Sequence, residues 1–262
     1  MNIDKPILVS VSGGRTSAFM AIYLKERFPE RKMLFVYGNT GKEKEATLVF
    51  LNNLDLHFNL GIVWVEAKVN PIKGKGTGYT IVDFATASRN GEPFESVIKK
   101  YGLPSKLFRH CTRELKEVPI HKYTKSILGK DYLTAIGIRA DEKHRLGSKK
   151  GNVYPLAEIN IDKKFINDWW SRQKFDLEIL EHQGNCDFCF LKSKKKRVML
   201  LDEGLNVDWW NEMEQNHQKG IQLMFDVRND LTIEDLIKIN NDANKQISLF
   251  DDISFDCFCK AS

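Results

Sequence analysis

The sequence lacks a membrane span and an export signal. Its apolar runs fall short of the roughly 20 residues that cross a bilayer, and its N-terminus has no signal-peptide pattern. Cysteine is scarce, with five in 262 residues. An odd number of cysteines without an export signal favours reduced thiols or metal ligands over a disulfide framework. We therefore expect a cytoplasmic protein that has no membrane partner.

A strong charge bias is also absent. The 40 basic and 35 acidic side chains leave a formal net charge of +5, which is compatible with an anionic ligand or nucleic acid but too small to argue for either. The only repeated feature is a Trp-Trp pair, at 169–170 and again at 209–210. We interpret both pairs as core and docking residues, which could also serve an interface in a homo-oligomer.

What the sequence does have is a glycine turn between an apolar run and a helical pattern. Residues 7–11 lead into Ser-Gly-Gly, and a helix is expected from residue 16 to about residue 27. Two glycines let the backbone approach an anion closely, and the helix directs free N–H groups at the same point. This pattern predicts a phosphate cradle formed by Ser10, Ser12, Gly13, Gly14, Thr16 and Ser17, with Arg15 as a charged donor. An ordinary capped strand-to-helix turn is the alternative; a Walker A ending is absent.

Strands then alternate with helices along the chain. Strands are expected at 32–37, 62–66 and 132–138, and helices at 43–56, 94–101 and, with a kink at a proline, 109–128. The alternation predicts a parallel sheet with helices on both faces and with ligands beyond the carboxyl ends of its strands. Residues that follow strand ends, and so could face the same pocket as the glycine turn, are Asn39, Thr40, Gly41, Arg139 and Arg145. The arginines could instead form ion pairs with nearby carboxylates.

Cys186 and Cys189 form a Cys-x-x-Cys pair. This spacing lets two thiolates converge on one metal ion or cluster. The remaining ligands would come from Cys111, His110, Cys257 or Cys259. Zinc accepts cysteine and histidine, whereas an iron–sulfur cluster prefers thiolates. Two buried structural cysteines are the alternative.

Four blocks of this sequence follow one another in a known order. Residues 12–17 resemble the PP-loop Ser-Gly-Gly-x-Asp-Ser, with Thr16 in place of the aspartate, and residues 39–41 resemble an Asp/Asn-Thr-Gly block. Residues 109–120 resemble Arg-x-x-Cys-Cys-x-x-x-Lys-x-x-Pro-Leu, and residues 137–145 resemble Gly-x-Arg-x-x-Glu/Gln-x-x-Arg. Together the blocks resemble the PAPS reductase-like family of the PP-loop (adenine nucleotide alpha-hydrolase-like) superfamily, and they cover most of residues 7–145.

The resemblance implies a division of the chain. Residues 1–150 would form a Rossmann-like α/β domain that binds an adenine nucleotide at the glycine turn. Residues 151–245 would form a mostly helical accessory region that carries the cysteine site. Residues 246–262 would form a mobile tail that contains Cys257 and Cys259.

The resemblance also implies adenylating chemistry coupled to sulfur transfer. An acceptor oxygen would attack the α-phosphate of ATP and release pyrophosphate, with Mg²⁺ on the phosphates and with Arg15 or Arg139 countering the developing charge. A [4Fe-4S] cluster, or alternatively Zn²⁺, at Cys111, Cys186 and Cys189 would serve sulfur transfer to a nucleic acid (tRNA or DNA) or a small molecule. His110 replaces one cysteine of the family's pair, so it or a tail cysteine would be the fourth ligand, unless one iron stays open.

Two other functions stay open at this stage. One is a phosphoadenylyl-sulfate or adenylyl-sulfate reductase, in which Cys257 or Cys259 would be the nucleophile and a thioredoxin-like protein the reductant. The family's C-terminal Glu-Cys-Gly-x-His context is absent from this chain. The other is a regulatory protein that binds a nucleotide without turnover, which the replacement of the usual aspartate by Thr16 allows.

Overall fold

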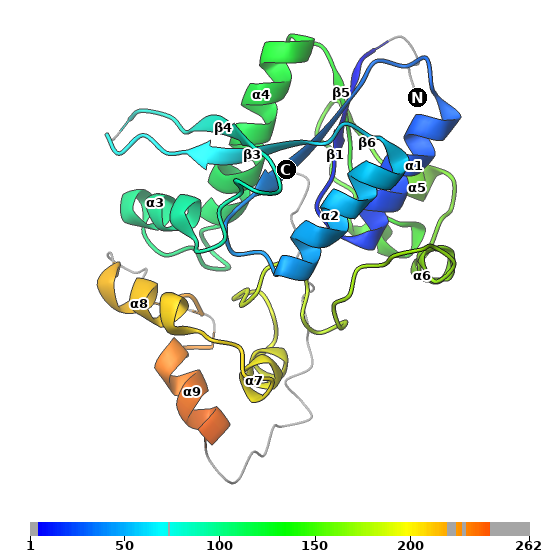
Figure 1. Cartoon of the computed structure of the whole chain (residues 1–262). Helices are drawn as coiled ribbons and strands as arrows, with labels where there is room; N and C mark the ends of the chain where they lie inside the picture. Colours follow the sequence, from blue (N-terminus) through cyan, green and yellow to red (C-terminus); the bar gives the residue numbers. More distant parts are fainter. Residues whose placement is uncertain (1–4, 73, 219–223, 227–228, 242–262) are drawn as a thin grey trace.

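The computed structural model describes residues 5–72, 74–218, 224–226 and 229–241. Their centre is a single six-stranded sheet (Figure 1). Its strands are β1 (Ile7–Ser10), β2 (Met33–Asn39), β3 (Val63–Lys68), β4 (Gly78–Val82), β5 (Leu133–Ala135) and β6 (Asn152–Val153). They lie in the order β4-β3-β2-β1-β5-β6. The fold is therefore α/β, and the tail cysteines Cys257 and Cys259 lie outside the described residues.

The sheet is mixed, whereas the sequence predicted a parallel one. Strands β1, β2, β3, β5 and β6 are mutually parallel, as expected. Strand β4 pairs with β3 in the antiparallel direction. The expectation of a wholly parallel sheet is wrong at this edge because only residues 69–77 join β3 to β4, and parallel neighbours need a longer crossover connection.

Helices cover both faces of this sheet. The α-helices of the described residues are α1 (Arg15–Arg27), α2 (Glu45–Phe58), α3 (Glu92–Tyr101), α4 (Val118–Leu128), α5 (Pro155–Glu158), α6 (Lys163–Trp170), α7 (Lys194–Asp202), α8 (Asp208–Asn216) and α9 (Ile233–Asn241). A π-helix, η1 (Cys111–Glu117), runs directly into α4, and a 3-10 helix, η2 (Ala140–Arg145), follows β5. None of the described helices is both long and apolar enough to cross a bilayer.

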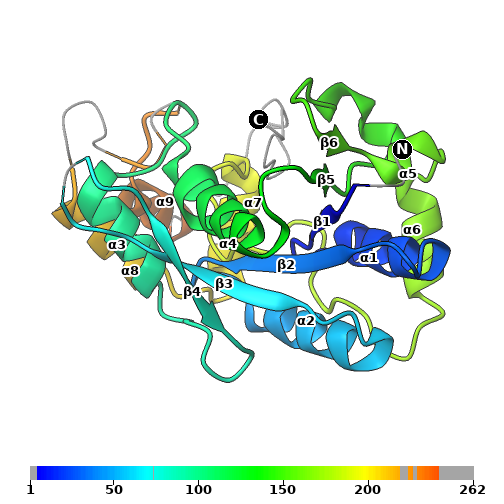
Figure 2. The same cartoon turned by 90° about the horizontal axis from the view of Figure 1, so that it is seen from above.

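Strand β1 shows how the two faces are filled. Ile7 and Val9 belong to the core that α1 and α2 cover, whereas Leu8 packs with Ile120 and Tyr123 of α4. Successive strand residues point to opposite faces, so β1 is apolar throughout because both of its faces are buried. Figure 2 shows α4 on one side of the sheet and α2 on the other.

The sheet and its core continue beyond the expected boundary at residue 150. Strand β6 pairs with β5, and Trp170 at the end of α6 is 1% exposed in the same core as α1. Trp170 also donates from Nε1 to the carbonyl oxygen of Arg15 at 3.0 Å. The first part of the expected accessory region thus packs on the sheet.

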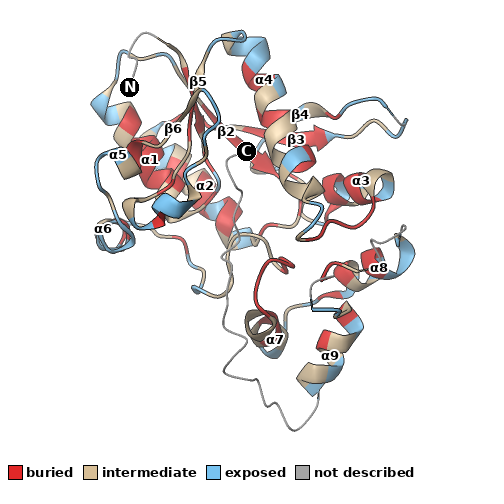
Figure 3. Cartoon of the chain, turned by 180° about the vertical axis from the view of Figure 1, so that it is seen from behind, coloured by how far each residue is buried: buried red, intermediate tan, exposed pale blue. Residues whose placement is uncertain are grey.

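A second core joins α3, α7, α8 and α9. Trp210 is 1% exposed at its centre, with ring centroids 5.5 Å from Phe94 of α3 and 5.2 Å from Phe225. Figure 3 shows buried positions on the facing sides of α3 and α8. The interpretation of the tryptophan pairs as core and docking residues is confirmed.

Gly91, which precedes α3, offers a test of this docking. A Cβ added there would lie 2.7 Å from ring carbons of Trp209, and its φ is +92°. Gly204, just after α7, has a φ of +79° with nothing within 4 Å of such a Cβ. We expect Gly204→Ala to lower the free energy of unfolding by about 1 kcal/mol through backbone strain alone, and Gly91→Ala by about 2–4 kcal/mol because a ring must also move. Urea unfolding of both variants measures the difference; equal losses would contradict tight docking.

Candidate functional site

A cavity of about 410 Å³ opens at the carboxyl ends of β1 and β5. These neighbours flank the point where the strand order reverses, because the chain leaves β1 for β2 and β3 on one side and returns to β5 on the other. Ligands of open α/β sheets bind at such a point. The lining includes polar or glycine residues from four separate segments: Ser10, Ser12, Ser17, Lys116, Gly137, Arg145, Gly184, Asn185, Cys186, Lys192 and Lys196.

The glycine turn, residues 12–17, is held by its own hydroxyl groups. The Ser17 Oγ accepts from the Ser12 backbone N at 3.0 Å and donates to the Gly14 carbonyl at 3.0 Å. Gly13 has a φ of +80°, and a Cβ there would lie 2.5 Å from the Thr47 Cγ2. Only glycine fits this backbone position. Ser12 and Ser17 of the turn line the cavity, whereas Gly13, Gly14 and Thr16 of the expected cradle do not.

Two other segments close on this turn. A Cβ at Gly137 would lie 3.0 Å from the Ser17 Cα, so the end of β5 comes directly against the start of α1. From the opposite side, the Asn185 Nδ2 donates to the Ser12 carbonyl at 2.8 Å. The Cys-x-x-Cys loop is thereby tied to the glycine turn. Sequence reasoning did not select Asn185, and no local pattern marks it.

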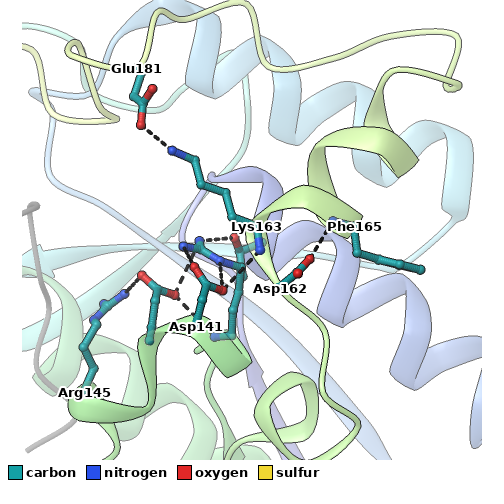
Figure 4. A network of polar contacts seen from close by, with 9 residues as sticks. Asp141, Arg145, Asp162, Lys163, Phe165 and Glu181 are labelled. Atoms are coloured by element: carbon teal, nitrogen blue, oxygen red, sulfur yellow. Dashed lines mark hydrogen bonds and ion pairs between the residues drawn. The ribbon is translucent and has the colours of Figure 1, made fainter.

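Asp141 and Arg145 of η2 lie in one polar network (Figure 4). Arg139, the residue before η2, joins it because it forms an ion pair with Glu142, as Arg145 does. The Arg139 guanidinium makes two 3.0 Å contacts to the Asp141 carboxylate and donates to the Thr16 Oγ1 at 3.1 Å. Hydrogen bonding from Arg139 lowers the pKa of the Asp141 carboxyl. Arg145 donates to Glu142 at 2.5 Å and lines the cavity. Both arginines therefore form ion pairs. Arg145 also lines the cavity, whereas Arg139 does not and contacts Thr16 instead.

Arg15 is directed elsewhere. Its guanidinium binds both oxygens of Asp176, at 2.6 and 2.7 Å, and donates to the Leu177 carbonyl at 3.0 Å. The sequence suggested that Arg15 would counter charge on a bound phosphate. In the structure it does not line the cavity; it fastens the segment after α6 to α1.

Asn39, Thr40 and Gly41 also lie outside the lining of the cavity. The Asn39 Nδ2 donates to Glu66 at 2.6 Å, and the Thr40 hydroxyl donates to Glu43 at 2.8 Å. Asn39 and Thr40 are 0% and 3% exposed. The expectation that this block faces the pocket is not met, because its polar groups are used to build the buried turn between β2 and α2.

Three lysines that the sequence analysis did not select as site residues also line the cavity. Lys116 lies on η1 with its Nζ 3.5 Å from the Glu43 Oε1. It belongs to the block at 109–120, and that position is the sequence feature that could have identified it as a site residue. Lys192 is only 5% exposed and donates to the Cys186 carbonyl at 2.8 Å. A basic run such as 192–197 is typical of a solvated helix face or of a contact with a nucleic-acid backbone. In the structure Lys192 and Lys196 line the cavity.

The segment expected as a kinked helix begins as the π-helix η1 and continues as α4. Pro119 is the second residue of α4, directly after η1. Its missing N–H removes one bond from this continuous helix, as is common at π-turns and kinks. Single π-turns are frequent at functional sites because the wider turn re-aims side chains. Here it presents Thr112 and Lys116 to the cavity.

The cysteines gather only in part. A hydrogen bond with Cys189, and then burial, raises the pKa of the Cys186 thiol, so these two sulfurs are neighbours. Cys111 packs against the same core. The His110 ring stacks between Tyr101 and Phe108, with centroids at 5.5 and 6.2 Å. Within the described residues no group of three or more His, Cys, Asp or Glu side chains is arranged to hold a metal ion.

His121 on α4 lies at the edge of the cavity. Burial, with Lys149 and Lys125 nearby, lowers its pKa from 6.5 to about 4. As the pH falls from about 6.5 to 4, His121 becomes protonated in the unfolded chain but stays neutral in the folded protein. The free energy of unfolding therefore decreases over this range. We expect His121 to account for about 1–2 kcal/mol of that decrease, since it is partly exposed. Urea unfolding of wild type and His121→Gln across this range measures the difference; parallel curves would contradict it.

The chain was compared with known proteins. No family model matches it. It is 27% identical over 161 residues to the uncharacterized protein MJ0066 of Methanocaldococcus jannaschii, an alignment that covers 60% of this chain and 28% of that protein. It is 39% identical over 195 residues to the uncharacterized nin region protein ORF290 of Escherichia phage lambda, covering 72% of this chain and 67% of the phage protein. On this similarity, the chain belongs to the same family as the nin region protein ORF290.

Proposed function

We propose that the chain is a PAPS reductase-like PP-loop enzyme with a Rossmann-like nucleotide-binding sheet. It binds ATP in the cavity and activates an acceptor by adenylation for sulfur transfer. One observation carries the proposal: three of the four blocks that resemble this family contribute lining residues to a single cavity. They lie near residues 12–17, 109–120 and 137–145, far apart in the sequence, and chance resemblance gives no reason for them to meet.

The charges around the cavity support a phosphate ligand. Lys116, Arg145, Lys192 and Lys196 line it together with Ser12 and Ser17 of the glycine turn. In the proposed step an acceptor oxygen attacks the α-phosphorus of ATP, the bond to the β-phosphate bridging oxygen breaks, and its electron pair leaves with pyrophosphate. The cations stabilise the charge that develops on pyrophosphate. A sulfur nucleophile then displaces AMP from the activated acceptor. Mg²⁺ bound to the phosphates would supply additional charge neutralisation.

The cluster or zinc ion expected at Cys111, Cys186 and Cys189 stays a prediction. The described residues bring two thiols together, and no step proposed above depends on a metal at these thiols. Metal and sulfide analysis of protein purified without oxygen tests it. Iron and sulfide that are lost in Cys186→Ser would support a cluster, and zinc alone would support a structural site.

Calorimetric titration with MgATP tests the proposed binding. Wild type should bind with a dissociation constant between about 1 μM and 1 mM. Ser17→Ala removes the hydroxyl that holds the glycine turn and should weaken binding about tenfold. Ser96→Ala is the matched control, because the Ser96 hydroxyl also donates to a backbone carbonyl but lies in α3, outside the cavity lining. Absence of binding by wild type, or equal losses in both variants, would contradict the proposal.

A further inference from the structure

A second cavity, of about 450 Å³, adjoins the first. The two cavities share five lining residues: Glu117, His121, Thr134, Lys149 and Asn152. The second one lies between α4 and the segment that leads into β6. A ligand in the second cavity would therefore be continuous with a ligand in the first.

Lysines dominate the lining of this second cavity. They come from α4, the turn after it and the segment before β6: Lys122, Lys125, Lys130, Lys149 and Lys150. Glu117 is the one carboxylate among the lining residues. In the part of the chain that the structure describes, none of the five lysines forms an ion pair with a carboxylate. Five ammonium groups held together without acidic partners create a strongly positive local potential.

The two cavities concentrate the positive charge of the molecule. Nine lysine or arginine side chains and two glutamates line them, an excess of seven positive charges. The whole chain has an excess of only five. All the remaining residues together therefore carry a net charge of −2. The small total charge of the sequence conceals one strongly basic surface.

We propose that the second cavity binds the phosphodiester backbone of a nucleic-acid strand, one nucleotide of which reaches into the first cavity as the acceptor. The proposal rests on the proposed function for the identity of that acceptor. Regularly repeated phosphates suit several unpaired lysines. An acidic protein would also be attracted, but protein partners need apolar anchors, and Val118 and Tyr132 are the only large apolar or aromatic residues besides His121 in this lining.

Fluorescence anisotropy with labelled oligonucleotides of about 20 residues tests this proposal. The probes are single-stranded RNA, single-stranded DNA and duplex DNA, each titrated over a range of salt concentrations. The variant is Lys125→Gln/Lys130→Gln/Lys150→Gln, which changes three exposed lysines that line the second cavity alone. The matched control is Lys32→Gln/Lys164→Gln/Lys174→Gln, with the same charge change at exposed lysines that line neither cavity.

We expect the cavity variant to bind its best probe at least about tenfold more weakly at about 100 mM salt, and the control to bind like wild type. The slope of log affinity against log salt should fall by about 2 for a single strand and slightly more for a duplex. The probe that binds most tightly identifies which kind of nucleic acid, single-stranded RNA, single-stranded DNA or duplex DNA, the second cavity prefers. Failure of all three probes to bind, equal losses in variant and control, or equal competition by polyglutamate would overturn the proposal.

Calorimetry with MgATP separates this proposal from the proposed function. The cavity variant should bind MgATP like wild type, because none of its three lysines lines the first cavity. Binding of MgATP without binding of any oligonucleotide would overturn only the nucleic-acid surface. Oligonucleotide binding that depends on the three lysines, without MgATP binding, would support the surface and contradict the proposed function.

Discussion

Arg197→Met is expected to lower the free energy of unfolding by about 3–5 kcal/mol. Arg197 of α7 and Asp226 form an ion pair whose side chains are each 1% exposed. Removing one partner leaves the other charge buried without compensation, which costs far more than the pair itself contributes. The Arg197 Nε and one Asp226 oxygen have no hydrogen-bond partner among the described residues, so the pair is already incompletely satisfied.

A double variant makes this expectation specific. Arg197→Met/Asp226→Leu should recover most of the loss, because two apolar side chains in such a site can be as stable as the ion pair. Arg172→Met, at an exposed position, is the control and should change stability by less than about 0.5 kcal/mol. Urea unfolding of all three variants is the measurement. A single variant as stable as wild type, or a double variant no better than the single, would show that the loss does not come from an uncompensated buried charge.

Lys116→Met should slow pyrophosphate release from ATP by at least about a hundredfold, the effect of removing one group that stabilises transition-state charge. Lys116 brings its ammonium group to the cavity from the π-helix, and its Nζ lies 3.5 Å from the buried Glu43. Its loss would therefore remove the proposed phosphate-binding charge and would also leave the Glu43 carboxylate without this ion pair. Steady-state pyrophosphate release, measured beside the unfolding free energy, separates the two effects.

Glu43→Gln is the informative partner variant. It keeps the lysine while removing the carboxylate charge, so pyrophosphate release should stay within about tenfold of wild type if Lys116 acts on the phosphates directly. Lys164→Met, at an exposed position on α6 outside the cavity, controls for a general change of charge. Equal rate losses in Lys116→Met and Glu43→Gln would mean that Lys116 serves the fold of the β2–α2 turn instead.

The sequence predicts much of the sheet because its central strands are buried on both faces. Strands β1, β2 and β3 and the helices after the first two appear as apolar runs and 3.6-residue patterns close to their observed bounds. Strand β4 carries no such signal, since Thr80 and Ile81 are exposed at the sheet edge. Residues 83–89 form turns and not a helix. The Asp83 carboxylate accepts from the Thr86 hydroxyl and backbone N–H, and such local bonds compete with helix formation.

The sequence predicts the parts of the site in which the backbone conformation requires glycine, but not the directions of the side chains. Only glycine fits at Gly13 and Gly137, because a Cβ at either position would lie 3.0 Å or less from a neighbouring atom. Gly137 lines the cavity, and so do Ser12 and Ser17 of the glycine turn. The direction of a side chain depends on partners far along the chain. Arg15 turns toward Asp176, 161 positions later, and no local pattern announces that. Lys192 likewise donates to the Cys186 carbonyl and is buried, although the basic residues that follow it in the sequence are typical of a solvent-exposed helix face.

The position of bond cleavage in ATP tests the central claim most directly. The protein is incubated with MgATP labelled at the γ-phosphate, with and without the best-binding oligonucleotide, and the labelled products are separated. Attack at the α-phosphate predicts that the label leaves in pyrophosphate, and that Lys116→Met suppresses its release. Label in orthophosphate would contradict the account. So would tight ATP binding with no label released, or sulfite release from a sulfonucleotide in place of ATP turnover.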